Sequence, residues 1–264
     1  MENYIKGNKE AWEEAFEKRH SEYGKNIKER MEKEFDFLEK DMITAIKKYD
    51  LKDKVIAQFC SNNGAELLSV VKHTKAKFGI GFDIAENQVE FSNQKAKELN
   101  IPCEFVAKNI LDIKDEYNQM FDFVFITIGA LNWFKDLNEF FKIISKTMKK
   151  DGIIIINEQH PFLNMLARDD EKNFNQDFPL NPCYSYFSKT WTFDNGMYYM
   201  TKKVYKSKTF TDFTHSLGEI INAMIKNNLC LLSFKEFDYD VSYAFLYANG
   251  KNFPLSYVLE AKKL

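Results

Sequence analysis

The chain has 264 residues, and its 45% hydrophobic content is enough for the core of one domain with elaborations. Its 37 basic and 39 acidic residues give a net charge of −2, which excludes the broad basic surface of a typical nucleic-acid-binding protein. The four cysteines are dispersed and predict neither a zinc site nor a disulfide framework, and the lack of a signal peptide or a membrane-spanning apolar run favours a cytoplasmic protein.

Residues 1–50 are charged, contain no proline and follow a helical pattern. Apolar residues recur at intervals of three and four, so we expect helices that pack on the rest of the chain through one face. Trp12 and Phe16 form a short stripe of this kind. A longer stripe consists of Ile27, Met31, Phe35, Leu38, Met42 and Ile46.

Residues 54–71 predict a strand, a tight turn and a helix. Residues 55–60 are a short apolar run suited to a strand buried on both faces, and Leu67, Leu68 and Val71 recur at helical spacing. The turn between them, Ser61-Asn-Asn-Gly64, is rich in residues that tolerate positive φ. Such a turn can bring backbone N–H groups and a helix N-terminus towards a ligand, as in a nucleotide-binding crevice.

Further short strands follow in regular order. Residues 78–84 form the second, and its Asp83 has the spacing of a carboxylate that accepts hydrogen bonds from ribose hydroxyls. Residues 103–107, 121–128 and 153–157 are the next three predicted strands. Two more are expected at residues 229–237 and 255–261.

The loop after residue 157 holds the candidates for acid–base chemistry. Glu158 and His160 are two residues apart at the end of a central strand and would point the same way in an extended segment. His160 is a candidate general base or orienting group, and the alternative is a histidine that hydrogen-bonds a covering segment. His215 is the next candidate, although a role at the start of an ordinary buried helix is favoured for it.

Residues 161–213 are polar, turn-rich and strongly aromatic. This stretch is too long for a plain loop, so we expect short strands, for example over residues 197–205, that form a cap. Aromatic walls suit a flat or partly apolar small molecule, and a homodimer interface is the alternative. Trp133 and Trp191 are candidates for the cavity wall.

Taken in order, these segments resemble the class I S-adenosylmethionine-dependent methyltransferases, most closely bacterial methyltransferase-domain proteins that act on small molecules. The resemblance implies an α/β fold with a doubly wound, mostly parallel seven-stranded sheet whose last strand inserts antiparallel. It also implies an N-terminal helical lid over residues 1–50, a methyltransferase core over residues 51–160 and 214–264, and a cap or substrate insert over residues 161–213.

The resemblance assigns a role to each part of the site. S-adenosyl-L-methionine would be the cofactor and S-adenosyl-L-homocysteine the product, with the methionine part at the first turn, the ribose at the second-strand acid and the adenine after strand three. The implied cofactor residues are Phe59, Cys60, Ser61, Asn62, Asn63, Gly64, Asp83, Ile84, Asn109, Ile110, Thr127, Ile128 and Gly129. The implied lid and substrate residues are Trp12, Phe16, Arg19, Tyr23, Trp133 and Trp191.

Three departures from the family pattern stand out. Ala57 or Gln58 occupies the place of the acid in strand one, only Gly64 remains of the glycine-rich turn, and Asn109 replaces an acid after strand three. We expect Asn62 and Asn63 to supply the turn geometry instead. The expected function is methyl transfer to an O or N atom of a small molecule, without a metal, a nucleic acid or a membrane.

Two alternatives remain open from the residues. The weakened turn is compatible with a catalytically silent domain of the same fold that binds the cofactor or a partner. A dinucleotide oxidoreductase is the second alternative, and it is disfavoured because no G-x-G-x-x-G opens the first helix.

Overall fold

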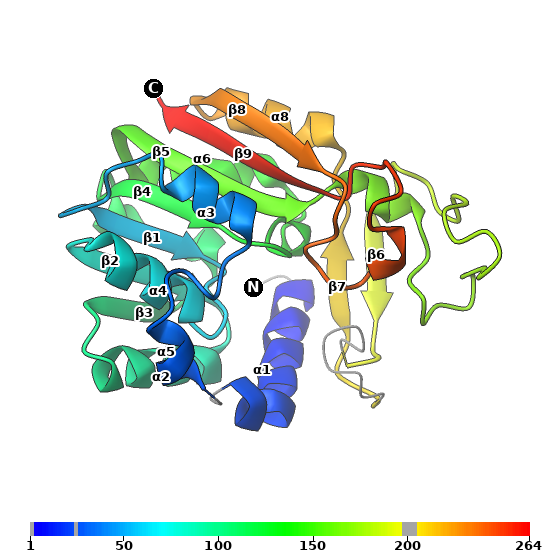
Figure 1. Cartoon of the computed structure of the whole chain (residues 1–264), viewed down its shortest axis with the longest axis horizontal. Helices are drawn as coiled ribbons and strands as arrows, with labels where there is room; N and C mark the ends of the chain where they lie inside the picture. Colours follow the sequence, from blue (N-terminus) through cyan, green and yellow to red (C-terminus); the bar gives the residue numbers. More distant parts are fainter. Residues whose placement is uncertain (1–2, 24–25, 197–204) are drawn as a thin grey trace.

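A seven-stranded sheet in the order β3-β2-β1-β4-β5-β9-β8 forms the centre of the molecule (Figure 1). The computed structural model describes residues 3–23, 26–196 and 205–264, except for the side chains of residues 19–23. The strands of this sheet are β1 (Val55–Phe59), β2 (Phe78–Asp83), β3 (Cys103–Ala107), β4 (Phe121–Ile126), β5 (Met148–Gln159), β8 (Leu229–Phe237) and β9 (Ser256–Lys263). The helices are α1 (Asn3–Tyr23), α2 (Ile27–Met31), α3 (Lys40–Ile46), α4 (Ala65–Thr74), α5 (Glu86–Glu98), α6 (Leu137–Thr147) and α8 (Leu217–Lys226).

The pairing of the strands confirms the predicted doubly wound fold. Strands β1 to β5 are parallel to their neighbours. Strand β9 runs antiparallel between β5 and β8, as expected for the last strand. The order reverses between β1 and β4, so the carboxyl ends of the parallel strands form a crevice at this point.

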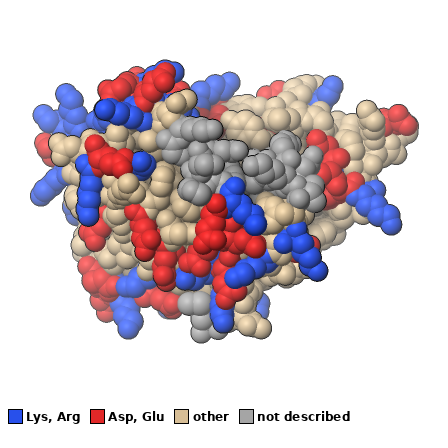
Figure 2. Space-filling model, turned by 90° about the horizontal axis from the view of Figure 1, so that it is seen from below, with Lys and Arg blue, Asp and Glu red and all other residues tan. Residues whose placement is uncertain are grey.

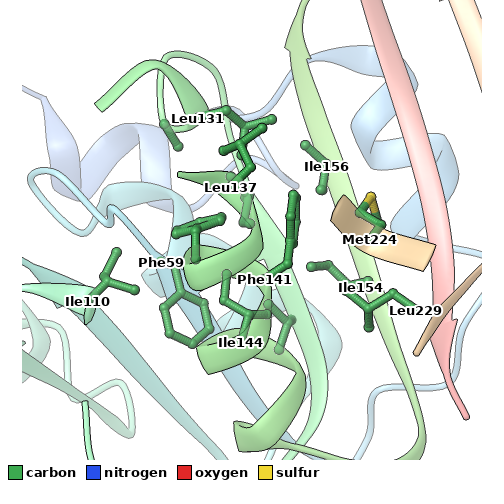
Figure 3. Packing of buried hydrophobic residues seen from close by; sticks show 14 of the residues in the cluster. Phe59, Ile110, Leu131, Leu137, Phe141, Ile144, Ile154, Ile156, Met224 and Leu229 are labelled. Atoms are coloured by element: carbon green, nitrogen blue, oxygen red, sulfur yellow. The ribbon is translucent and has the colours of Figure 1, made fainter. Parts of the chain in front are cut away.

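Two buried clusters, one on each face of the sheet, explain the continuous apolar runs of the central strands. In β5, Ile154 and Ile156 belong to the first cluster and Ile155 to the second, because side chains alternate across a strand. Helices α6 and α8 cover the first face, and α3, α4 and α5 contribute to the second cluster. Figure 3 shows Phe141 of α6 and Met224 of α8 beside Ile154 and Ile156.

The apolar stripe of residues 27–46 packs on the second cluster, but it does not form one helix. Helices α2 and α3 are separated by residues 32–39, and Phe35 has a left-handed φ of 54°. Arg30 Nε donates to Asp36 Oδ2 at 2.6 Å and fixes this reversal. Both short helices nevertheless place their apolar residues in the same cluster.

A second sheet of two antiparallel strands, β6 (Thr190–Phe193) and β7 (Phe210–Phe213), lies beside the central sheet (Figure 1). Helix α1 packs against it, since Asn8 and Thr211 exchange two hydrogen bonds of 2.8 and 2.7 Å. The strand predicted over residues 197–205 falls almost wholly outside the described residues. Among the helices of the described ranges, none combines the length and apolar character needed to cross a membrane.

Candidate active site

A cavity of about 850 Å³ lies at the carboxyl ends of the parallel strands. The lining residues between positions 60 and 130 lie mostly in the loops after β1 to β4, and we call them the sheet side of the cavity. The lining residues between positions 164 and 214, together with those of α1, lie opposite. We call residues 164–214 the cap side. Open α/β sheets bind their ligands at this edge. Ten predicted cofactor residues line the cavity: Cys60, Asn62, Asn63, Asp83, Ile84, Asn109, Ile110, Thr127, Ile128 and Gly129.

The turn after β1 is sharply bent, as its sequence predicts. Cys60, Asn62 and Gly64 have left-handed φ angles of 59°, 49° and 74°. The N–H of Ser61 donates to a backbone carbonyl of β2 at 2.9 Å. Phe59, Ser61 and Gly64, three of the predicted cofactor residues, are buried and do not line the cavity. Their position indicates that they shape the turn rather than contact a ligand.

We expect Gly64→Ala to destabilise the protein by about 2 kcal/mol, because a left-handed φ costs an alanine roughly 1–2 kcal/mol and the new methyl group adds a clash. A Cβ at Gly64 would lie 2.6 Å from the Phe105 ring and 2.8 Å from Ser92 Cβ. Urea unfolding measures the change. Gly218→Ala is the matched control, since its Cβ would meet no atom closer than 4.0 Å. Equal stability of the two variants would contradict the strained turn.

Asp83, at the end of β2, is tied to the turn. Its Oδ2 accepts a hydrogen bond from the N–H of Asn62 at 2.8 Å, and its Oδ1 accepts one from the N–H of Ala85 at 3.0 Å. Burial raises the pKa of the Asp83 carboxyl to about 6, although these donors oppose the shift. The carboxylate still lines the cavity and can accept further hydrogen bonds from a ligand.

A second carboxylate lies at the same edge and was missed in the sequence. Glu66, in the first turn of α4, accepts hydrogen bonds on Oε2 from Gln58 Nε2 at 2.5 Å and from Thr127 Oγ1 at 2.6 Å. It lines the cavity, and burial raises its pKa. Gln58, one of the two residues predicted at the place of the family's strand-one acid, thus donates to the carboxylate of another residue. An acid at the second position after a glycine turn was the only available signal.

Glu158 does not occupy the predicted catalytic position. Its side chain is 2% exposed and does not line the cavity, whereas the neighbouring Gln159 does. Its two carboxylate oxygens accept hydrogen bonds from the N–H groups of Gly129 at 2.6 Å, Ala130 at 3.0 Å and Leu131 at 3.3 Å. Burial nevertheless raises its pKa. In this structure Glu158 anchors the loop that follows β4, and its predicted catalytic role stays a prediction.

The two histidines are also placed outside the cavity. His160 Nδ1 accepts a hydrogen bond from the N–H of Phe162 at 3.0 Å, and its Nε2 lies 3.1 Å from Glu236 Oε1. His215 Nε2 lies 2.8 Å from the carbonyl oxygen of Phe134. Burial lowers the pKa of both rings. Neither histidine lines the cavity, and these contacts fit the alternatives of a loop contact for His160 and a helix start for His215. Their predicted catalytic roles stay predictions.

Aromatic rings form a large part of the cavity wall. The ring of Trp12 meets those of Trp133 and Phe210 edge-on, with centroid distances of 5.4 Å in each pair. Trp191 meets Tyr184 in the same way at 4.6 Å. Trp12, Trp133, Trp191 and Tyr184 all line the cavity, as predicted for the three tryptophans. Edge-to-face pairs of this kind are each worth about 0.5–1.5 kcal/mol beyond the area that they bury.

The remaining predictions for the N-terminal helix have different outcomes. Phe16 is buried against Phe91, with ring centroids 5.5 Å apart, and it does not line the cavity. It is therefore a packing residue of α1. The side chains of Arg19 and Tyr23 lie outside the described residues, so their predicted contacts stay predictions.

Three charged residues on the cap side had no signal in the sequence. Arg168 Nε lies 2.9 Å from Glu171 Oε1, and the hydroxyl of Tyr184 donates to Glu171 Oε2 at 2.7 Å. Asp212 lines the same part of the cavity, and its Oδ1 accepts no hydrogen bond from any described residue. Burial raises the pKa of Asp212 to about 7. Arg168 and Glu171 are three residues apart in an irregular segment, and Asp212 of β7 joins them only in the folded insert.

Comparison of the fold with solved structures shows a broad likeness to methyltransferases. A putative S-adenosylmethionine-dependent methyltransferase from Listeria monocytogenes has 18% identity and a TM-score of 0.62, covering 84% of this chain and 97% of its own. One from Clostridium acetobutylicum ATCC 824 has 14% identity and a TM-score of 0.60, covering 94% and 98%.

A third similar structure is geranyl diphosphate C-methyltransferase from Streptomyces coelicolor A3(2), solved with Mg²⁺, geranyl diphosphate and S-adenosyl-L-homocysteine. It has 12% identity and a TM-score of 0.63, and the match covers 99% of this chain and 98% of that one. At such low identities these likenesses establish the fold alone. No curated protein sequence matches this chain significantly.

The sequence itself matches a family profile. The profile is described as a methyltransferase domain, and it aligns with residues 63–211, more than half of the chain. This range contains Asp83, the end of the turn into α4, the loop after β4, and the cap side of the cavity as far as residue 211. The chain therefore belongs to the methyltransferase-domain family and is an enzyme with the class I methyltransferase fold.

Proposed function

We propose that this protein transfers the methyl group of S-adenosylmethionine to an O or N atom of a small-molecule acceptor. The observation that carries the proposal is the continuity of the cavity, whose lining runs from Asp83 on the sheet side to Trp133 and Trp191 towards the cap. One space can thus hold a nucleoside cofactor and a flat or partly apolar acceptor together. Holding the two reactants in line is itself worth several orders of magnitude in rate, on the order of 7 kcal/mol or more.

The sheet side fits each part of this cofactor. The Asp83 carboxylate can accept hydrogen bonds from both ribose hydroxyls, and Ile84 and Ile110 provide apolar surface next to it. Asn109 caps its own turn, since its Oδ1 accepts a hydrogen bond from the N–H of Leu111 at 3.3 Å. It thereby fixes the backbone against which an adenine would lie. When bound, the cofactor would supply an electrophilic methyl group on a positively charged sulfur.

Glu66 fits the ammonium group of the methionine part. Its Oε2 is occupied by Gln58 and Thr127, and its Oε1 remains for a cationic ligand. We expect Glu66→Gln to weaken S-adenosylmethionine binding about tenfold, which corresponds to the ~1.4 kcal/mol of one charge-assisted contact. Titration calorimetry measures this. Glu90→Gln, on the exposed side of α5, is the control, and an unchanged affinity of the Glu66 variant would remove this contact from the site.

The direct test of the proposed function is calorimetric titration with S-adenosylmethionine, S-adenosylhomocysteine and, as a control, NAD. We expect micromolar binding of the first two and none of NAD. Binding of NAD in their place would favour the oxidoreductase alternative. Absence of heat with the first two would indicate that the altered turn has abolished the site, and the catalytically silent domain would then be the better account.

The remaining assignments follow from surface charge and the character of the cavity. In Figure 2, Lys and Arg residues are interspersed with Asp and Glu residues over the face shown, which fits a small-molecule acceptor better than a nucleic acid. A cytoplasmic location and a homodimer through the cap stay predictions. For the dimer, the exposed cap residues Phe178 and Phe187 are the candidate contacts, since they are 61% and 70% exposed. Gel filtration of a Phe187→Ser variant tests this.

A further inference from the structure

The cap side of the cavity carries an excess of negative charge. Its charged lining residues in the described part of the chain are one cation, Arg168, and two carboxylates, Glu171 and Asp212. Arg168 and Glu171 form an ion pair with a distance of 2.9 Å, so each offsets the charge of the other. The negative charge that remains is that of Asp212.

Asp212 is held beside an aromatic face. Trp191 and Asp212 are directly opposite each other in the antiparallel pair of β6 and β7, so their side chains project from the same face of this small sheet. Both line the cavity, and Tyr184 lies against Trp191. A carboxylate next to an indole and a phenol is the combination that attracts a protonated amine, through charge and through the faces of the rings.

The hydrogen bonding of the Asp212 carboxylate is also incomplete. Its Oδ1 is buried and accepts no hydrogen bond from the described residues, although such groups normally have a partner. Burial and Glu171 raise the pKa of this carboxyl, and Arg168 lowers it. Its pKa of about 7 suits a group that both pairs with an ammonium ion and accepts a proton from it.

We propose that Asp212 recognises the amino group of the acceptor, and that the acceptor is a small aliphatic amine that carries an aromatic ring and is methylated on nitrogen. This inference rests on the proposed function. The bound ammonium gives one proton to the Asp212 carboxylate, which leaves a neutral amine. The nitrogen lone pair then forms a bond with the methyl carbon while the carbon–sulfur bond breaks and its electron pair goes to sulfur. The methylated ammonium and the neutral thioether leave, and Asp212 loses its proton to water.

This assignment separates the chain from its structural relative that methylates geranyl diphosphate. A diphosphate placed against the cap side would meet the carboxylates of Glu171 and Asp212, and the cation there, Arg168, is already paired with Glu171. Moreover, the described residues contain no group of three or more His, Cys, Asp or Glu side chains that could hold a metal ion. Like charges in a site of low dielectric repel strongly, so we expect anionic acceptors to be rejected.

The experiment compares two probes of nearly the same shape, tyramine and 4-hydroxyphenylacetate, by calorimetric titration into the protein saturated with S-adenosylhomocysteine. We expect tyramine to bind at least ~10-fold more tightly, the effect of about one charge-assisted contact. Asp212→Asn should lose this preference while its affinity for S-adenosylhomocysteine stays within about twofold. Asp194→Asn, an exposed residue between β6 and β7, is the matched control and should keep the preference.

The outcomes distinguish this inference from the function on which it rests. If S-adenosylhomocysteine does not bind to the unaltered protein, the proposed function fails first. If it binds, but tyramine does not bind or shows no advantage over the anionic probe, the amine assignment is overturned. The same holds if the preference survives in Asp212→Asn. Thermal melting of each variant shows whether a lost preference reflects the missing carboxylate or an unfolded cap.

Discussion

Asp83→Ala is expected to weaken S-adenosylmethionine binding by about 10²-fold or more. Two hydrogen bonds from ribose hydroxyls to a carboxylate are worth roughly 1.5–3 kcal/mol each, and the substitution removes both. It also removes the acceptor that holds the N–H of Asn62 at 2.8 Å, so the turn loses part of its support. Titration calorimetry measures the affinity, and thermal melting shows whether the variant is folded.

The matched control for Asp83 is Asp115→Ala, whose side chain is 83% exposed and does not line the cavity. We expect it to bind with unchanged affinity. Asp83→Asn should fall between the two, because the amide keeps one acceptor oxygen and loses the charge. An Asp83→Ala variant that is folded and binds within about threefold of the unaltered protein would refute the ribose contact, since even one lost bond is worth about 10-fold.

The raised pKa of Asp83 gives this contact a pH dependence. The ligand's hydroxyls donate to the ionised carboxylate, so binding favours the deprotonated form. With a pKa of about 6 in the free protein, the affinity should rise as the pH increases from 5 to 6 and level off above 7. In Asp83→Asn the affinity should depend less steeply on pH, and the pH dependence that remains should be that contributed by Glu66.

Glu158→Ala is expected to lower the free energy of unfolding by about 4 kcal/mol. The substitution leaves the half-buried N–H of Gly129 and the buried N–H groups of Ala130 and Leu131 without their acceptor, and each unsatisfied buried group costs roughly 1–3 kcal/mol. Glu158→Gln should cost less, because its amide oxygen can still serve the donors of one carboxylate oxygen. Urea unfolding followed by circular dichroism measures both variants.

Glu90→Ala, at an exposed position of α5, is the control and should change the stability by no more than about 0.5 kcal/mol. If Glu158 anchors the loop, the free energy of unfolding should rise from Glu158→Ala to Glu158→Gln to the unaltered protein. If Glu158→Gln were as stable as the unaltered protein but inactive with bound cofactor, the original prediction of a catalytic Glu158 would regain support.

The sequence was sufficient for the parts of the fold that depend on local pattern. The apolar runs of β1, β2, β4 and β5 were recognisable because both of their faces are buried. The doubly wound sheet with its antiparallel last strand followed from the family resemblance. The spacing of Asp83 from the first turn was likewise visible. These features depend on residues that are close together in the chain. The periodicity of their apolar side chains indicates directly which faces are buried.

The sequence was misleading where a side chain's direction depends on tertiary contacts. Glu158 and His160 do share an orientation that differs from that of Gln159, but it is Gln159 that lines the cavity. Alternation along a strand gives two faces and does not say which one meets the ligand. Asp212 was missed for a related reason, since its significance comes from its pairing with Trp191 across β6 and β7.

The position of β9 has a consequence for the way in which the protein is made. Strand β5 pairs with β9 through seven residue pairs, from Ile153 with Lys262 to Gln159 with Ser256, and β8 joins the sheet only through β9. On the ribosome, the edge of β5 must therefore wait, unpaired, for more than ninety further residues to be synthesised. Closure of the central sheet at β9 therefore comes after the parallel strands β1 to β5 have been synthesised.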